Sequence, residues 1–93
     1  MSQVVDRPRV RDSDVDVDGV FQVVLYNDNV NSFDHVIVSL ITVFGHPAAI
    51  AEKIAMEAHQ KGRSVAEVED FEKAMLHKLM LVNAKLTAEV EKI

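Results

Sequence analysis

Apolar and β-branched residues first gather over residues 20–26, which read VFQVVLY. Such a run is typical of a strand that is buried on most of both faces. The short polar side chains of Asn27, Asp28 and Asn29 follow at once, and residues of this kind favour turns. We therefore expect a buried strand over residues 20–26 that ends in a polar turn.

The next apolar positions recur at helical spacing. Ser32 is a residue type that caps helices, and the apolar face beyond it consists of Phe33, Val36, Ile37, Leu40, Val43 and Phe44. Gly45 is suited to ending this helix, and Pro47 to beginning a second one at its first position. The second helix should end at Gly62, with an inward stripe of Ile50, Ile54, Ala55 and Ala58.

Residues 63–69 fit either a short strand or the start of the next helix. We favour a strand, because Asp70 can then cap a third helix. The predicted inward face of that helix is Phe71, Ala74, Met75, Lys78, Leu79 and Val82. Residues 86–90 alternate between apolar and polar, which predicts a last edge strand. The order is β-α-α-β-α-β, an α+β domain with a small three-stranded antiparallel sheet packed against three helices.

Residues 1–19 are polar, and we expect a flexible acidic tail there, with residues 20–93 forming the folded domain. Asp14, Asp16 and Asp18, followed by Gly19, match the first half of a calcium-binding loop. The twelfth position of such a loop should be a bidentate acid, and here it is Leu25. A solvated tail is therefore the better interpretation.

Composition narrows the function. A chain of 93 residues predicts one domain, and the absence of cysteine excludes disulfides, thiolate metal sites and a cysteine nucleophile. The net charge of −5 argues against nucleic acid and anionic membrane surfaces as partners. No apolar run approaches the roughly 20 residues that span a bilayer, and the start of the chain lacks the form of a secretory signal. We expect a cytoplasmic protein.

Enzyme and metal-site motifs are also missing from the sequence. The four histidines, His35, His46, His59 and His77, form no pair at i, i+3 or i+4, so we predict no metal site and no cofactor. His35 and His77 are interpreted as solvated. There is no Gly-x-Ser-x-Gly and no Gly-rich phosphate loop. A hydrolase that uses Asp28 and His59 is an alternative of another class, but it lacks an activated nucleophile.

One combination of motifs resembles a known family. The run from Val23 to Asp28, then a helix, then a second helix that ends in His59-x-x-Gly62-Arg63, is similar to ClpS. ClpS proteins are adaptors of the bacterial N-degron pathway. The resemblance implies a non-catalytic protein, expected to be a monomer, that binds substrates with an amino-terminal Leu, Phe, Tyr or Trp. It would deliver them to a Clp AAA+ unfoldase–protease by docking on the N-terminal domain of a ClpA- or ClpC-type unfoldase.

The resemblance also implies site residues. The ligand's α-amine would be held by Asn27, Asp28 and His59, with Asn29 beside them. A protonated α-amine has a pKa of about 8 and is cationic at neutral pH, so burying it requires acceptors. Asp28 offers charge, the Asn27 carbonyl a lone pair and a neutral His59 a ring nitrogen. Protonation of His59 should weaken binding.

The ligand's first side chain would enter a hydrophobic pocket formed by Leu25, Asn31, Phe33, Val36, Ala55 and Ala58. Plain core packing is the alternative for Leu25 and Val36, and Leu86 or Ala88 of the last strand could close the pocket. Docking on the unfoldase would involve Glu69, Glu72 and His77, for which a solvated helix face is the alternative.

The sequence also departs from the family pattern. Asn29 stands where many members have a second Asp, Phe33 where a Met acts as gatekeeper, and Ala55 and Ala58 replace bulkier residues. The connection before the last strand is shorter than usual. These departures leave open a diverged module that docks on the unfoldase and modulates it without binding N-degrons.

Overall fold

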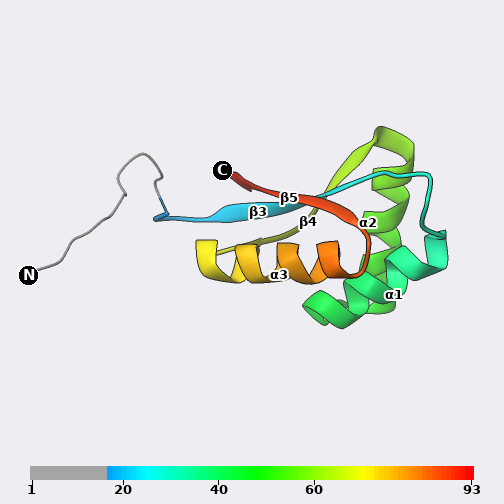
Figure 1. Ribbon diagram of the computed structural model, residues 1–93, viewed down its shortest axis with the longest axis horizontal. Helices are drawn as coiled ribbons and strands as arrows, with labels where there is room; N and C mark the ends of the chain where they lie inside the picture. Colours follow the sequence, from blue (N-terminus) through cyan, green and yellow to red (C-terminus); the bar gives the residue numbers. More distant parts are fainter. Residues whose placement is uncertain (1–16) are drawn as a thin grey trace, which may run out of the picture.

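The computed structural model describes residues 17–93. The elements run in the order β3 (Phe21–Tyr26), α1 (Phe33–Phe44), α2 (Ala48–Lys61), β4 (Arg63–Glu69), α3 (Phe71–Asn83) and β5 (Thr87–Lys92). Figure 1 shows this arrangement. The predicted α+β fold, its element order and its three-stranded antiparallel sheet are confirmed. Most of the expected acidic tail lies outside the described residues, and so do Asp14 and Asp16 of the half calcium motif.

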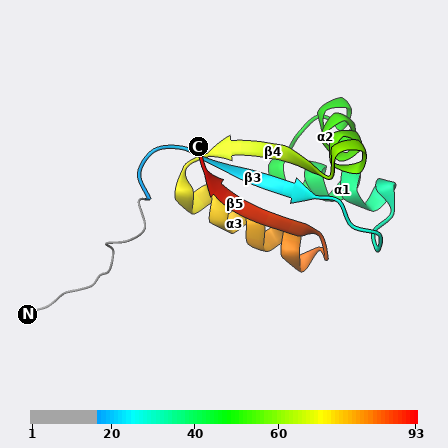
Figure 2. The ribbon, with the colours of Figure 1, turned by 90° about the horizontal axis from the view of Figure 1, so that it is seen from above.

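The central strand is β3, which pairs antiparallel with β4 on one side and β5 on the other. Figure 2 shows it between the two edge strands. The register places Tyr26 opposite Arg63 in β4 and opposite Thr87 in β5. Both rows of backbone polar groups of β3 are therefore used within the sheet. Val23 and Val24 are fully buried, as the apolar run of residues 20–26 predicted.

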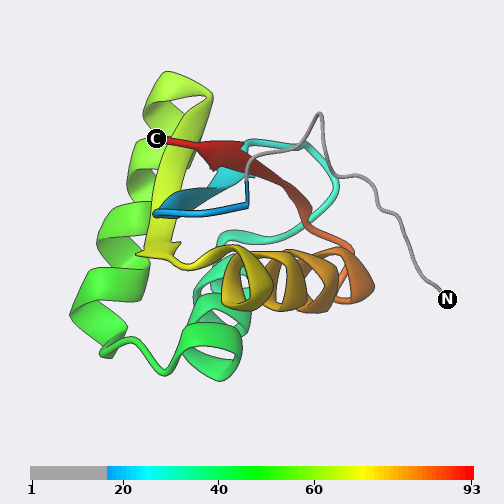
Figure 3. The ribbon, with the colours of Figure 1, turned by 90° about the vertical axis from the view of Figure 1, so that its left-hand side faces the viewer.

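The three helices form the rest of the core. α3 lies along one face of the sheet, whereas α1 and α2 pack near the end at which β3 finishes (Figures 1 and 3). Leu40 of α1 and Leu81 of α3 are the largest fully buried side chains of the helices. Over residues 17–93, no helix combines the length and the apolar character that crossing a bilayer requires.

Side chains at the helix starts explain two of the boundaries. Ser32 Oγ accepts a hydrogen bond of 3.1 Å from the His35 amide, which caps α1. Asp70 Oδ1 accepts one of 2.9 Å from the Lys73 amide, which caps α3. Each satisfies an amide that has no partner inside its own helix. The choice of a strand for residues 63–69 is confirmed.

Glycines in the left-handed region end the first two helices, as predicted. Gly45 has φ 74° and Gly62 has φ 90°, a conformation that side chains disfavour. The Gly62 amide donates to the Ala58 carbonyl and closes the last turn of α2. The start of α2 differs by one residue, because Pro47 is the N-cap and Ala48 the first helical residue.

The predicted inward faces of α2 and α3 were wrong in part. Ile50 is 43% exposed, and Ala51 is buried in its place. In α3, Leu79 is 52% and Val82 42% exposed, whereas Leu81 is fully buried. The second half of α3 is apolar on every side, so its periodicity does not select a face. Packing against β3 and β5 decides which side is buried.

The corrected face of α3 can be tested with two leucines of one helix. Leu81→Ala should lower the free energy of unfolding by about 2–5 kcal/mol, because it leaves a cavity in the core. The matched control Leu79→Ala removes an exposed side chain and should change it by about 0.5 kcal/mol or less. Urea denaturation followed by circular dichroism measures both. Equal losses would contradict this assignment of the buried face.

Candidate functional site

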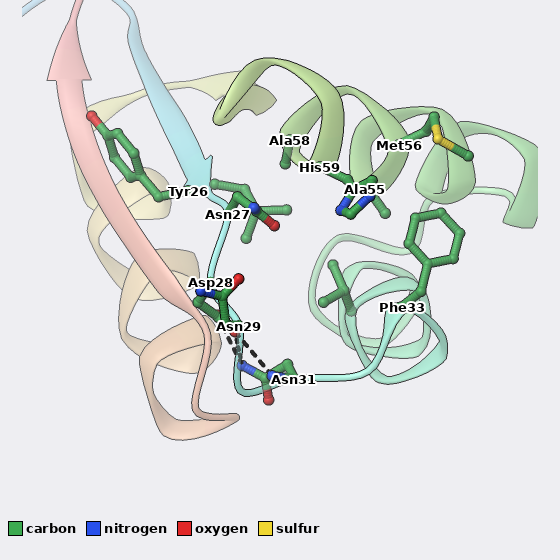
Figure 4. A pocket seen from close by; sticks show the side chains of 12 residues that line it. Tyr26, Asn27, Asp28, Asn29, Asn31, Phe33, Ala55, Met56, Ala58 and His59 are labelled. Carbon is green, nitrogen blue, oxygen red and sulfur yellow. Dashed lines mark hydrogen bonds between the residues drawn. The ribbon is translucent and has the colours of Figure 1, made fainter.

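A pocket of about 480 Å³ opens where β3 ends, between the following loop and the helices α1 and α2 (Figure 4). It has the size of a small-ligand site. Every residue predicted for the amine site and for the hydrophobic pocket lines it. The lining residues are Leu25, Tyr26, Asn27, Asp28, Asn29, Asn31, Phe33, Val36, Ala55, Met56, Ala58 and His59.

The polar end of the pocket is formed where β3 meets the end of α2. The Asn27 amide donates a hydrogen bond of 3.0 Å to the Gly62 carbonyl. His59 lies one turn before Gly62 on the same helix, so this bond brings Asn27 and His59 to the same side of the pocket (Figure 4). Within residues 17–93, the Asn27 side chain and the His59 ring have no hydrogen-bond partner. Their polar atoms therefore remain available to a ligand.

Asp28 organises the loop that follows. Its Oδ1 accepts hydrogen bonds of 2.9 Å from the amides of Val30 and Asn31, and one of 3.2 Å from Asn31 Nδ2. Its Oδ2 accepts a bond of 3.0 Å from Asn31 Nδ2. Partial burial raises the pKa of Asp28, but the hydrogen bonds from Asn31 and Val30, with the nearby His35 ring, outweigh it and lower the pKa. Asp28 is therefore ionised at neutral pH.

Asn31 lines the pocket, but its amide group is engaged elsewhere. Besides its bonds to Asp28, Nδ2 donates a hydrogen bond of 2.7 Å to the Lys85 carbonyl in the turn between α3 and β5. His35, expected to be merely solvated, is exposed but contacts the same turn, with Nε2 2.8 Å from the Ala84 carbonyl. Neither turn residue was predicted to matter, because contacts to a backbone carbonyl leave no signal in the sequence.

The other end of the pocket is apolar. Leu25, Ala55 and Ala58 are buried and form its floor. Phe33 of α1 and Met56 of α2 flank it from facing helices (Figure 4). Met56 was not predicted, since it lies outside the inward stripe of its helix.

Leu86 or Ala88 of the last strand was considered as a residue that could close the pocket, but neither lines it. Both are buried in the core.

Tyr26, the last residue of β3, lines the pocket, but its hydroxyl is engaged in a polar network. Its hydroxyl donates a hydrogen bond of 3.0 Å to Glu91, which also accepts bonds of 2.7 Å from Arg63 and 3.2 Å from Gln22. The bond to the negatively charged Glu91 is the main cause that raises the pKa of Tyr26, because it favours the neutral phenol. The bond from Arg63 is the main cause that lowers the pKa of Glu91.

The residues predicted for docking lie on β4 and α3, away from the pocket. His77 Nδ1 is 2.6 Å from Glu69 Oε2, and the two side chains are 20% and 11% exposed. The ring of Phe44 packs edge-on against His77. The solvated interpretation of His77 is therefore wrong, whereas Glu72 in the first turn of α3 is exposed. Among residues 17–93, no three His, Cys, Asp or Glu side chains gather as metal ligands would.

Comparison with known proteins gives consistent matches. A family model described as ATP-dependent Clp protease adaptor protein ClpS matches residues 18–89. Two relatives are described as ATP-dependent Clp protease adapter protein ClpS. The one from Acetivibrio thermocellus is 39% identical over 72 residues, which cover 77% of this chain and 71% of the relative. The one from Syntrophus aciditrophicus is 39% identical over 49 residues, which cover 53% of this chain and 46% of the relative. The latter match thus spans about half of that relative's length.

A solved structure also resembles this fold. It is described as Agrobacterium tumefaciens ClpS2 bound to L-phenylalaninamide. The TM-score is 0.72 and the sequence identity is 26%, and the match covers 77% of this chain and 94% of the solved chain.

The network around Tyr26 can be tested by its ionisation, because the chain contains one tyrosine and no tryptophan. The phenolate absorbance should rise at a pH above the ordinary value of about 10. Glu91→Gln should lower the midpoint, because it removes the negative acceptor and leaves the Arg63 cation near the ring. Glu89→Gln makes the same charge change on the same strand without touching the hydrogen bond, so it should lower the midpoint less. Equal shifts in the two variants would contradict the assigned cause.

Proposed function

Because the chain belongs to the ClpS family of Clp protease adaptor proteins, we propose that it captures N-degron substrates in this pocket. The protein is an adaptor and not an enzyme. The pocket binds the free α-amine and the bulky hydrophobic first side chain of a substrate, which is then delivered to a Clp AAA+ unfoldase–protease. The solved ClpS2 structure supports this proposal, since L-phenylalaninamide carries a free α-amine, a large apolar side chain and an amide in place of the next peptide bond.

One observation carries the proposal. A single pocket combines an ionised carboxylate, two polar side chains without partners among residues 17–93, and an apolar floor. A buried ammonium needs acceptors on several sides, and here Asn27 and Asp28 come from the loop after β3 and His59 from α2. Charge-assisted hydrogen bonds contribute about 1.5–3 kcal/mol each. Burial of a Leu or Phe side chain contributes about 1.5–3 kcal/mol more. Because an internal residue of a protein has no α-amine, the site selects chain ends.

The charge of the site matches one ammonium group. Asp28 is the single carboxylate among the described residues that line the pocket, and Asn29 supplies no charge. One negative group facing one positive group leaves no surplus charge to bury, which limits the cost of removing both from water.

The delivery step needs a second surface. We assign it to the start of α3, where Glu72 is exposed beside the Glu69–His77 pair. The expected partner is the N-terminal domain of a ClpA- or ClpC-type unfoldase, and the adaptor would act as a monomer in the cytoplasm. In this proposal the folded domain of residues 20–93 carries both surfaces.

Fluorescence anisotropy with labelled peptides tests the amine site. A peptide that begins with Phe should bind, and its N-acetylated form should not. Asp28→Asn keeps an oxygen that can accept from the loop but removes the charge, so affinity should fall by roughly 10- to 100-fold.

The matched control is Glu72→Gln, which makes the same charge change outside the pocket and should leave affinity unchanged. If no peptide of any first residue binds to the unaltered protein, the pocket has lost its ligand. The diverged module that modulates the unfoldase without binding N-degrons would then be the better assignment.

The pH profile of the same binding tests His59. Affinity should be greatest near neutral pH. On the alkaline side it falls as the peptide's α-amine loses its proton, at a pKa of about 8. On the acid side it falls because a protonated His59 places a second cation beside the ammonium.

His59→Gln keeps a polar side chain that does not titrate. The affinity of this variant should still fall on the alkaline side of the profile, but it should no longer fall on the acid side down to about pH 5. If affinity falls equally at acid pH in both proteins, this role for His59 is ruled out.

A further inference from the structure

We propose that Asn31 and His35 are positioning residues that hold Asp28 in the amine site. They do so through hydrogen bonds to the Lys85 and Ala84 carbonyls in the turn between α3 and β5, and we call this pair of contacts the clasp. This inference rests on the proposed function, because the position of Asp28 matters to binding only if an amine binds there. It changes the role of Asn31 from a wall of the hydrophobic pocket to a support of the polar end.

The Asn31 side chain spans from Asp28 to the turn. Its Nδ2 lies 3.2 and 3.0 Å from the two carboxylate oxygens of Asp28 and 2.7 Å from the Lys85 carbonyl oxygen. An amide nitrogen carries two hydrogens, so one serves the carboxylate and the other serves the carbonyl. The same nitrogen therefore ties the amine-binding carboxylate to a segment 54 residues further along the chain.

The turn is a rigid anchor for this contact. The Lys85 amide donates to the Val82 carbonyl at 2.9 Å, and the Leu86 amide donates to the Leu81 carbonyl at 3.0 Å. Lys85 itself has φ 74°. This is the Schellman pattern that closes a helix, with a lysine where glycine is usual. These bonds satisfy the carbonyls of Leu81 and Val82 and leave those of Ala84 and Lys85 to other partners.

His35 is the partner of the Ala84 carbonyl, at 2.8 Å from its Nε2. Ser32 fixes its backbone, because the His35 amide donates to the capping Ser32 hydroxyl. Asn31 precedes the cap and His35 lies in the first turn of α1, so two adjacent carbonyls of one turn are bound by side chains from one short stretch. The stretch and the turn are thereby held in a fixed relation.

The chemistry of the clasp suits a site for a cation. Asn31 and the loop amides orient the Asp28 carboxylate with neutral donors, so its negative charge is not cancelled by a resident cation. Oδ2 accepts the single Asn31 bond, and a carboxylate oxygen has room for a further donor. Asp28 lines the pocket, so this further position is where an ammonium would bind.

Two measurements on one set of variants test the clasp. Asn31→Ala should weaken binding of the Phe-starting peptide by roughly three- to tenfold, the effect of losing an ordinary hydrogen bond. It should also raise the pKa of Asp28, followed by NMR of the side-chain carboxyl carbon, because the Asn31 side-chain donor that favours the ionised form is gone while the two backbone donors remain. His35→Phe keeps an aromatic ring but loses the bond to Ala84, and it should cause a smaller loss of affinity.

The His35 ring also contributes to the low pKa of Asp28, so its own variant separates that contribution from the Asn31 bonds. The matched control is Asn83→Ala, the same change at an exposed position near the end of α3. It should leave both the affinity and the pKa of Asp28 unaltered. Amide NMR spectra verify that each variant is folded.

The outcomes are distinguishable. If Asn31→Ala binds the peptide like the unaltered protein and the pKa of Asp28 does not move, the clasp has no positioning role. If affinity falls while the pKa of Asp28 stays the same, Asn31 contacts the ligand directly and the inference is wrong. If the unaltered protein binds no peptide but Asn31→Ala raises the pKa of Asp28, the clasp stands and the proposed function fails.

Discussion

The hydrogen bond from the Asn27 amide to the Gly62 carbonyl joins the end of the central strand to the end of α2. It forms because Gly62, with φ 90°, turns the chain from the helix straight into β4, whose first residue Arg63 pairs with Tyr26. A strand end, a helix end and a strand start thus meet at one point. His59 lies one turn back from that point, and Asn27 lies at it. The pocket is a consequence of this junction, and the other contacts adjust what it can hold.

Electrostatics explains why the polar end of the pocket is built from so few groups. Asp28 both folds its loop, by accepting from the amides of Val30 and Asn31, and supplies the negative charge of the site. The hydrogen bonds that order the loop also favour the ionised carboxylate, which offsets its partial burial. One residue therefore joins the stability of the loop to its affinity for a cation. Any change that neutralises Asp28 acts on both.

Much of the fold could be predicted from the sequence because the signals there are local, whereas the pocket residues were implied by the family resemblance. Ser32, Asp70, Gly45 and Gly62 mark helix ends through bonds and backbone angles that involve only near neighbours. The Asn27-Asp28 turn with His59 carried the family resemblance, and those residues do line one pocket.

The failures involve contacts between distant segments. Leu79 was placed inward and Leu81 was not, because the second half of α3 is apolar on every side and packing against the sheet selects the face. The contacts of Asn31 and His35 with Ala84 and Lys85 could not be predicted either. Their acceptors are backbone carbonyls, which every residue carries, so no residue type marks them in the sequence. Met56 was missed because it lies beside the inward stripe of α2 and not on it.

The alanines of α2 both pack in the core and, at two positions, line the pocket. Ala51, Ala55 and Ala58 are buried at spacings that bring them to one side of the helix, so α2 can pack closely against α1 and β4. Bulkier side chains at the last two positions would fill the space that is now the pocket. With alanines there, the apolar floor stays open to a ligand side chain. Covering it would contribute favourable free energy in proportion to the apolar area removed from water. Close helix packing and an open apolar floor are thus two results of the same small residues, while Phe33 and Met56 flank the floor from separate helices.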